Sequence, residues 1–443
     1  MSIPMIEFLE KNGPATSKEI QTKTGLSQTA VARKLRAMGR RIVKFKEGRI
    51  VRYAATQNAF GADDSLSLVT VDNFGNTVKI AMVRPLAHGG FWIEKVPGMP
   101  NVLLGDSGNG LYDDLPYFLM DLCPQGFLGR QIAEELATTT DNFPPDPRLW
   151  HTDHIGRYLI SNGDDLPGNL KFGDQALSRI RHKPIAISDS DYPELADSVM
   201  SGVIPGSSAG GEQPKFTAFC RERSAHVIVK FSPKGDNEVA RRWRDILITE
   251  YHATEACHNM NFPAAETRLL DMNGRLFLES DRFDRVGELG RSSMISLQSI
   301  DGEFTGLLNN WPQVIRALCK RELVSLEHGY DVQMLWIFGN LINNTDMHLG
   351  NLSFGIDGNV FRLLPVYDMC SMGFAPKSGG EVLPYSFIPS VPERVELNKK
   401  SVGFAIDMAQ DFWKRVAADK RISPEFSEFL KAGNPIDLIS SEL

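Results

Sequence analysis

The chain has 443 residues and a formal net charge of −7, and its length predicts two to four domains rather than one core. No stretch approaches the ~18 uninterrupted apolar residues of a membrane span, and Glu7 and Glu10 interrupt the first apolar run, so we expect neither a membrane partner nor a secretory leader. The five cysteines are scattered without a CxxC pair, which favours reduced thiols and a cytoplasmic location.

Charge is distributed unevenly along the chain. Residues 1–54 hold twelve Lys and Arg against four Asp and Glu, a balance of +8 that leaves −15 for the rest. Such asymmetry marks a domain boundary and indicates that only this head meets a polyanion.

The basic head has the pattern of three helices and a hairpin. Residues 3–12 predict a short amphipathic helix, and a capping box at Thr16 begins a second helix that ends at Gly25. A third capped helix is predicted over 26–41, and 42–55 alternates like a hairpin.

This order is typical of a winged helix-turn-helix, so we predict a DNA-binding domain over 1–55. The third helix would enter a major groove and the basic hairpin would follow the backbone. A docking domain with a solvated basic face remains an alternative. The residues expected to face duplex DNA are Gln28, Thr29, Arg33, Lys34, Arg36 and Arg40.

The middle of the chain carries fewer chemical signals. Residues 56–66 have the composition of a linker, and 67–86 alternates around DNFGN like a hairpin. The glycine- and acid-rich segment 105–116 is interpreted as a surface loop, and HTDH at 151–154 as a capped helix start rather than a metal site.

A glycine-containing loop lies within 201–219. Gly210 and Gly211 would let backbone N–H groups approach an anion, and Lys215 follows them. The loop lacks the GK[ST] of a Walker A motif, and a plain β-turn remains an alternative.

The next strand and helix supply a possible partner for the loop. Lys230 stands alone in the apolar run 226–233, and a buried lysine needs an anionic partner. Glu250 lies among apolar residues of a helix predicted over 237–260. A strand lysine paired with a helix glutamate under a glycine loop is how a kinase-type lobe grips nucleotide phosphates. A surface lysine and a solvated helix acid remain the alternatives.

The strand predicted over 276–285 stops in polar residues, as the hinge of a two-lobed nucleotide-binding fold would. Its backbone would meet the edge of the base. Asp284 would lie near the ribose or brace the lobe.

The stretch NNTDMHLGNLSF holds three chemically active side chains. Asp346 and Asn351 have the D-x-x-x-x-N spacing of a kinase catalytic loop, and Asp368 follows a strand predicted over 359–367. We expect Asp346 to orient the attacking hydroxyl, while Asn351 and Asp368 hold Mg²⁺ on the ATP phosphates. His348 is expected to brace the loop.

Five segments taken in order, SSAGGEQPKF, VIVKFSP, ESDRFDR, NNTDMHLGNLSF and VYDMCSMGFAP, resemble the motifs of the HipA family of bacterial serine/threonine kinases. These kinases are the toxin halves of toxin–antitoxin pairs, and the resemblance runs from about residue 67 to the C-terminus. It implies an α+β, two-lobed kinase-like fold. The expected parts are an N-terminal subdomain with connector over 67–172, an N-lobe over 173–285 and a helical C-lobe over 286–443.

The resemblance also implies residue roles. Asp346 matches the catalytic aspartate and Lys230 the lysine on the ATP phosphates. The other matches are Asn351 and Asp368 (magnesium), Asp281, Arg282 and Phe283 (hinge), Asp284 (near the ribose) and Ser208 (autophosphorylated), with Ser207 beside it as a second candidate. A protein substrate is expected; family members act on aminoacyl-tRNA synthetases, but nothing in this sequence specifies a target. The fused head departs from the family pattern, in which a separate antitoxin binds DNA, and it suggests direct DNA contact or self-inhibition.

We therefore predict an ATP- and Mg²⁺-dependent serine/threonine kinase with a DNA-binding head. One alternative is a transcription regulator whose kinase-like body senses nucleotide. Another is a metal-dependent nuclease that uses Asp346, His348 and Asp368.

Overall fold

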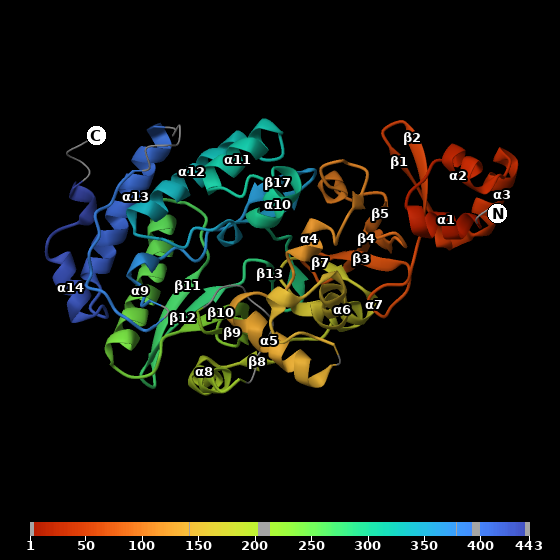
Figure 1. The fold of residues 1–443 in the computed structure, drawn as a ribbon. Helices are drawn as coiled ribbons and strands as arrows, with labels where there is room; N and C mark the ends of the chain where they lie inside the picture. Colours follow the sequence, from red (N-terminus) through yellow and green to blue (C-terminus); the bar gives the residue numbers. More distant parts are fainter. Residues whose placement is uncertain (1–3, 141, 203–212, 378, 392–398, 439–443) are drawn as a thin grey trace.

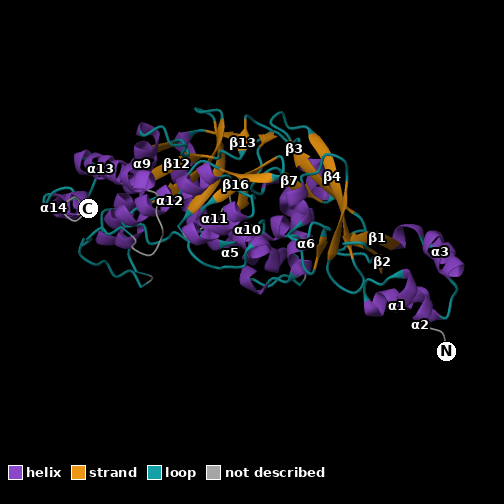
Figure 2. Ribbon diagram, turned by 90° about the horizontal axis from the view of Figure 1, so that it is seen from above, coloured by secondary structure: helices purple, strands orange, loops and turns teal. Residues whose placement is uncertain are grey.

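The computed structural model describes residues 4–140, 142–202, 213–377, 379–391 and 399–438. The molecule is elongated, with the head at one end and the helical C-lobe at the other (Figure 1). The two five-stranded sheets lie between these ends, as Figure 2 shows. Four of the predicted glycine-loop residues, Ser207, Ser208, Gly210 and Gly211, lie outside the described residues.

The head contains the three helices and the hairpin that the sequence predicts. Thr16 and Glu19 form the capping box, Gly25 ends the second helix in a left-handed conformation, and Ser27 caps the third. The elements are α1 (Met5–Asn12), α2 (Ser17–Thr24), α3 (Gln28–Ala37), β1 (Ile42–Glu47) and β2 (Ile50–Ala55).

The segment expected as a linker, 56–66, joins the head to the body without a helix or strand before Leu66, and it is packed against the body. Phe60 is buried with φ of 60° and stacks on Phe91 at a centroid distance of 5.7 Å, and Phe172 packs against its edge. The hairpin of the head also packs on the body, where Phe45 lies 6.0 Å from Trp92. These contacts fix the head against the next domain.

The middle domain, residues 66–179, is an antiparallel sheet of order β6-β5-β4-β3-β7 with helices beside it. The predicted hairpin over 67–86 is present as its first two strands, and His151 precedes a helix, as expected for HTDH. The elements are β3 (Leu66–Val71), β4 (Thr77–Pro85), β5 (Phe91–Lys95), β6 (Leu111–Tyr112), α4 (Tyr117–Met120), α5 (Gly126–Thr139), α6 (Thr152–Asn162), β7 (Leu170–Phe172) and α7 (Asp174–Arg179).

The N-lobe is a second five-stranded sheet, of order β11-β12-β10-β9-β8, in which only β8 and β9 run parallel. Side chains alternate between its faces, so Phe277 joins an aromatic core on one face while Leu276 and Leu278 pack toward the long helix α9 on the other. The elements are β8 (Ala186–Ile187), α8 (Tyr192–Met200), β9 (Lys215–Cys220), β10 (Ala225–Phe231), α9 (Glu238–Asn259), β11 (Thr267–Met272) and β12 (Arg275–Asp281).

The C-lobe is built around α12, which is apolar on nearly every side and is therefore buried between α11 and α13. No helix of the described residues is long and apolar enough to cross a membrane. The elements are β13 (Arg285–Val286), β14 (Gly290–Arg291), β15 (Ile295–Ser296), α10 (Leu297–Phe304), α11 (Trp311–Lys320), α12 (Leu326–Leu341), β16 (Ser353–Asp357), β17 (Val360–Leu363), α13 (Lys399–Ala418) and α14 (Pro424–Leu430).

Candidate active site

Lys230 of β10 is directed toward α9 by strand alternation. Its neighbours Val229 and Phe231 enter the aromatic core, so the lysine points to the opposite face. There its Nζ donates to both carboxylate oxygens of Glu250, at 2.6 and 2.7 Å, and forms a further ion pair with Asp368. The predicted pairing of Lys230 with Glu250 is confirmed, and the lysine joins the N-lobe to the C-lobe.

The three charged groups shift one another's pKa values. Burial alone would lower the pKa of the Lys230 ammonium, but the carboxylates of Asp368 and Glu250 outweigh it and hold that pKa above its ordinary value. Burial raises the pKa of Glu250 to about 6, against the opposing effect of Lys230. Burial would also raise the pKa of Asp368, yet Lys230 and Lys215 keep it below the ordinary value. At neutral pH the site therefore holds one buried ammonium between two carboxylates.

Asp368 adopts a backbone conformation that residues other than glycine rarely take, with φ of 54°. Such strain persists where surrounding contacts enforce it, and it concentrates at functional sites. The strained backbone lets the carboxylate turn back toward Lys230.

The catalytic-loop candidates Asp346 and Asn351 come together after the end of α12. The Nδ2 of Asn351 donates to the backbone carbonyl of Asp346 at 2.7 Å, and the amide N–H of Asp346 donates to the side chain of Asn344 at 3.0 Å. No hydrogen bond to Oδ1 of Asn351 is found among the described residues. The Asp346 side chain is about half exposed.

His348 braces this loop, as expected. Its Nδ1 accepts the amide N–H of Gly350 at 3.1 Å, and its backbone carbonyl accepts the indole N–H of Trp311 at 2.9 Å. Its Nε2 lies 3.8 Å from a carboxylate oxygen of Asp346, which is too long for a strong hydrogen bond.

The hinge candidates Asp281, Arg282, Phe283 and Asp284 all line the same cavity. Two roles were expected for Asp284, contact with the ribose and bracing of the lobe, and its contacts are those of a bracing residue. It lies 3.2 Å from Arg282, pairs with Arg285 and accepts the amide N–H of Gly168 at 2.9 Å. The side chain of Arg282 is buried in this cluster, whereas Phe283 is only partly buried.

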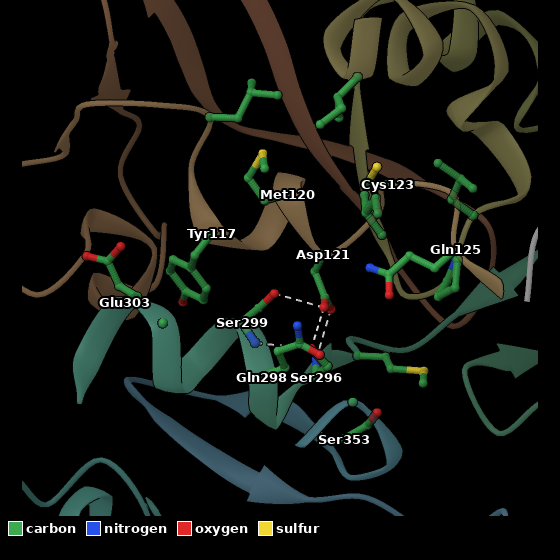
Figure 3. A pocket seen from close by; sticks show the side chains of 18 of the residues that line it. Tyr117, Met120, Asp121, Cys123, Gln125, Ser296, Gln298, Ser299, Glu303 and Ser353 are labelled. Atoms are coloured by element: carbon green, nitrogen blue, oxygen red, sulfur yellow. Dashed lines mark hydrogen bonds between the residues drawn. The ribbon is translucent and has the colours of Figure 1, made fainter. Parts of the chain in front are cut away.

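A cavity of about 1090 Å³ joins the hinge candidates to Lys230, Asn351 and Asp368, whereas Asp346 and Glu250 are not among its lining residues. Lys230, Asn351 and Asp368 line one part of it, and residues of the middle domain and α10 line another (Figure 3). That second part includes Tyr117, Met120, Asp121, Cys123, Gln298 and Ser299.

Lys215 is a site residue that sequence reasoning placed in the loop motif without a role of its own. It is paired across the β9–β10 ladder with Lys230, it is 2% exposed, and it lines the cavity. The register of β9 and β10 is what reveals Lys215 as a site residue, because it places both lysines side by side on one face of the sheet.

These side chains fit a nucleotide with a magnesium ion. Two buried lysines suit phosphate oxygens, and the amide oxygen of Asn351 with the carboxylate of Asp368 offers the hard oxygen ligands that Mg²⁺ prefers. By contrast, the described residues contain no cluster of three or more His, Cys, Asp or Glu side chains that could hold a metal, so Asp346, His348 and Asp368 do not form one.

The proposed DNA-facing residues gather on the head. Gln28, Thr29 and Arg33 are exposed, as are Lys34, Arg36 and Arg40. Arg40 differs from the others because it pairs with Asp63, at 3.1 Å, and so helps hold the head to the body.

Comparison with known proteins identifies the class. Residues 62–181 match the family described as the YjjJ-like toxin, middle domain, and residues 207–422 match the HipA-like C-terminal domain. The structure is similar to HipA of Shewanella oneidensis MR-1, solved with HipB and operator DNA, with a TM-score of 0.59 and 15% identity over 85% of this chain and 96% of that one. The chain therefore has the α+β, HipA-like kinase fold that the sequence predicted.

A curated relative places the chain more closely. Toxin YjjJ of Escherichia coli K12 is 35% identical over 423 residues, which is 94% of this chain and 93% of that protein. The chain belongs to the HipA-like toxin family, in its YjjJ-like branch.

Proposed function

We propose that this protein is an ATP- and Mg²⁺-dependent serine/threonine protein kinase with a DNA-binding head, acting in the cytoplasm. The observation that carries the proposal is Lys230 held between Glu250 and Asp368 at a cavity that also takes in Asn351. In kinase lobes the same lysine–glutamate pair and metal-binding aspartate must both be in place for phosphoryl transfer.

Each residue then has a defined task. Lys230 and Lys215 bind phosphate oxygens, and the hinge backbone at 281–283 meets the edge of the adenine. Asp346 orients the hydroxyl of the acceptor serine or threonine and accepts its proton at a carboxylate oxygen. Asn351 and Asp368 would hold Mg²⁺, which when bound neutralises charge on the phosphates.

The head and the glycine loop complete the proposal. The exposed basic face of α3 would enter a major groove of duplex DNA. The similar HipA structure was solved in a complex with HipB and operator DNA, which supports a DNA partner for this family. We also propose that Ser208, or its neighbour Ser207, is autophosphorylated and that the kinase acts on a protein substrate.

Replacing the proposed base tests the reaction. Asp346→Ala should lower phosphate incorporation from labelled ATP by roughly 10²–10⁴-fold, because a positioned general base contributes that much. The wild-type label should map by mass spectrometry to the peptide that contains Ser207 and Ser208. Asp357→Ala, which removes an exposed acid in the next hairpin, is the matched control and should leave labelling unchanged. Equal labelling of wild type and Asp346→Ala would refute the assignment.

The same preparations separate the alternatives. Salt-dependent duplex binding without any turnover of ATP would favour a transcription regulator that senses nucleotide. Cleavage of DNA that requires Mg²⁺ but not ATP, and that Asp346→Ala abolishes, would favour a nuclease. A nuclease function would give the buried Lys230–Glu250 pair no role.

A further inference from the structure

Asp121 of the middle domain makes a partly buried contact with the C-lobe. It follows α4 directly, and its carboxylate meets the first turn of α10 (Figure 3). One oxygen accepts the amide N–H of Ser296 at 2.8 Å, and the other accepts the hydroxyl of Ser299 at 2.9 Å and that of Ser296. Three donors from one helix start thus converge on one carboxylate from another domain.

The residues that Asp121 holds are joined to the catalytic loop. Ser296 ends β15 and pairs with Ser353 of β16, and the amide N–H of Leu297 donates to the carbonyl of Leu352 at 2.7 Å. Leu352 is the neighbour of Asn351. The position of the Asn351 backbone therefore depends on the place where α10 begins.

Strand β16, which pairs with Ser296, is also linked by hydrogen bonds to the residue before Asp368. The hydroxyls of Ser353 and Tyr367 lie 2.7 Å apart, and Tyr367 donates to the carbonyl of Gly350 at 3.2 Å. Because Tyr367 precedes Asp368 and Gly350 precedes Asn351, the two proposed magnesium ligands are tied to one another through this strand.

We propose that Asp121 is a positioning residue for the magnesium-binding pair Asn351 and Asp368, acting through the start of α10. The kinetic consequence of this inference rests on the proposed kinase function. Asp121 itself lines the second part of the cavity and makes no hydrogen bond or ion pair with Lys230 or Asp346. The middle domain thus contributes to the active site although it supplies none of the groups proposed for chemistry.

The structure offers a matched control on the same helix. Asp301 is a buried aspartate within α10, and like Asp121 it receives three hydrogen bonds, from the hydroxyl of Thr305 and the amides of Leu307 and Leu308. These bonds order the loop after the helix and do not reach the catalytic loop. Asp301→Asn and Asp121→Asn therefore make the same chemical change at the two ends of α10.

The test compares the kinetics of the two variants. Asp121→Asn should lower kcat and raise the Mg²⁺ concentration for half-maximal activity, each by roughly 10- to 100-fold, the range found for residues that orient metal ligands. Asp301→Asn should lower thermal stability and leave both values unchanged for the folded enzyme. Ser299→Ala, which removes one of the three bonds, should give a smaller shift of the same kind. A change in melting temperature alone for Asp121→Asn would overturn the proposal.

A second measurement keeps this inference separate from the proposed function. Hydrogen exchange of the peptide spanning 349–354 should quicken in Asp121→Asn and not in Asp301→Asn, with no nucleotide present. If the wild type transfers no phosphate, the proposed function fails, and this exchange alone decides whether Asp121 positions the loop. Equal exchange in the two variants would also overturn the proposal.

Discussion

The ammonium group of Lys230 is held by Glu250 of α9 rather than by a neighbour in its own strand. Both oxygens of Glu250 accept from its ammonium group, and burial holds the pKa of Glu250 near 6. The pair is therefore charged at neutral pH and loses the carboxylate charge as the pH falls. A titration of activity can detect this.

The rate of phosphate transfer should fall as the pH drops below about 6, because a protonated Glu250 no longer orients Lys230. Glu250→Gln should lose roughly 10- to 100-fold in rate at pH 7.5, the worth of hydrogen bonds to a charged group, and should lack this acid inflection. A pH–rate profile of both proteins provides the measurement. Glu255→Gln on the same helix, whose nearest ion-pair distance is 3.9 Å, should keep the wild-type profile. An unchanged inflection in Glu250→Gln would assign it to another group.

At the residue scale, the sequence predicted the Lys230–Glu250 pair but not the burial of Lys215 beside it. Lys230 and Glu250 are charged residues in apolar surroundings, so their burial was visible in the pattern. Lys215 stands at the end of a glycine-rich segment, where a lysine usually faces solvent, and its burial depends on pairing with β10. The bracing of Asp284 by Gly168 joins residues 116 apart, and no local pattern encodes it.

Among the elements, α3 is the one whose local sequence and proposed role agree most fully. Ser27 caps it, Val31 and Leu35 are buried, and its arginines point outward. Arg33, Lys34 and Arg36 form no ion pair with the described residues, so their charges are available to phosphates.

The double variant Arg33→Ala/Arg36→Ala should weaken duplex binding about equally for all sequences if these side chains meet phosphates. The slope of log affinity against log salt should fall by roughly two, about one for each phosphate that is no longer neutralised. Fluorescence anisotropy of a labelled duplex at several salt concentrations measures this. Lys79→Ala/Lys320→Ala removes the same charge from exposed positions on the body and should leave the slope unchanged. Equal slopes for all three proteins would remove α3 from the interface.

The elements of the head were predictable because their signals are local: a capping box, a left-handed glycine and alternation around a tight turn. The packing of segment 56–66 was not predictable, because its glycines and acids are those of a linker. Only the tertiary contacts of Phe60 with Phe91 and Phe172, 31 and 112 residues away, show that it is packed.

Over the whole molecule, buried charges and aromatic contacts hold the parts together. Asp165 of the connector lies 3.5 Å from Arg282 of the hinge and 2.9 Å from Arg285, which follows the hinge. These arginines hold the pKa of Asp165 well below its usual range, although burial opposes them. At the other end, Phe45 of the head packs against Trp92 of the middle domain. Both contacts join segments that are far apart in sequence, so the sequence predicted the order of the domains but not their attachment.

Phe45→Ala should lower the free energy of unfolding by about 3–5 kcal/mol, the usual cost of removing a buried aromatic ring, and should release the head from the body. Urea denaturation and limited proteolysis near residues 56–66 measure the two effects. Phe74→Ala is the matched control: Phe74 is 85% exposed and should change stability by less than about 0.5 kcal/mol. If both variants unfold alike, the hairpin contact does not hold the head.

The burial of Phe60 decides where the chain can be cut. A truncation that begins at residue 67, the apparent start of the kinase-like body, would remove a ring that fills space between Phe91 and Phe172. The shortened protein would then aggregate or lose activity for lack of core, and the loss would be mistaken for a catalytic contribution of the head. A head-free preparation should instead retain Phe60 and begin after Thr56, whose bridge to Leu86 marks the end of the hairpin's pairing with the sheet.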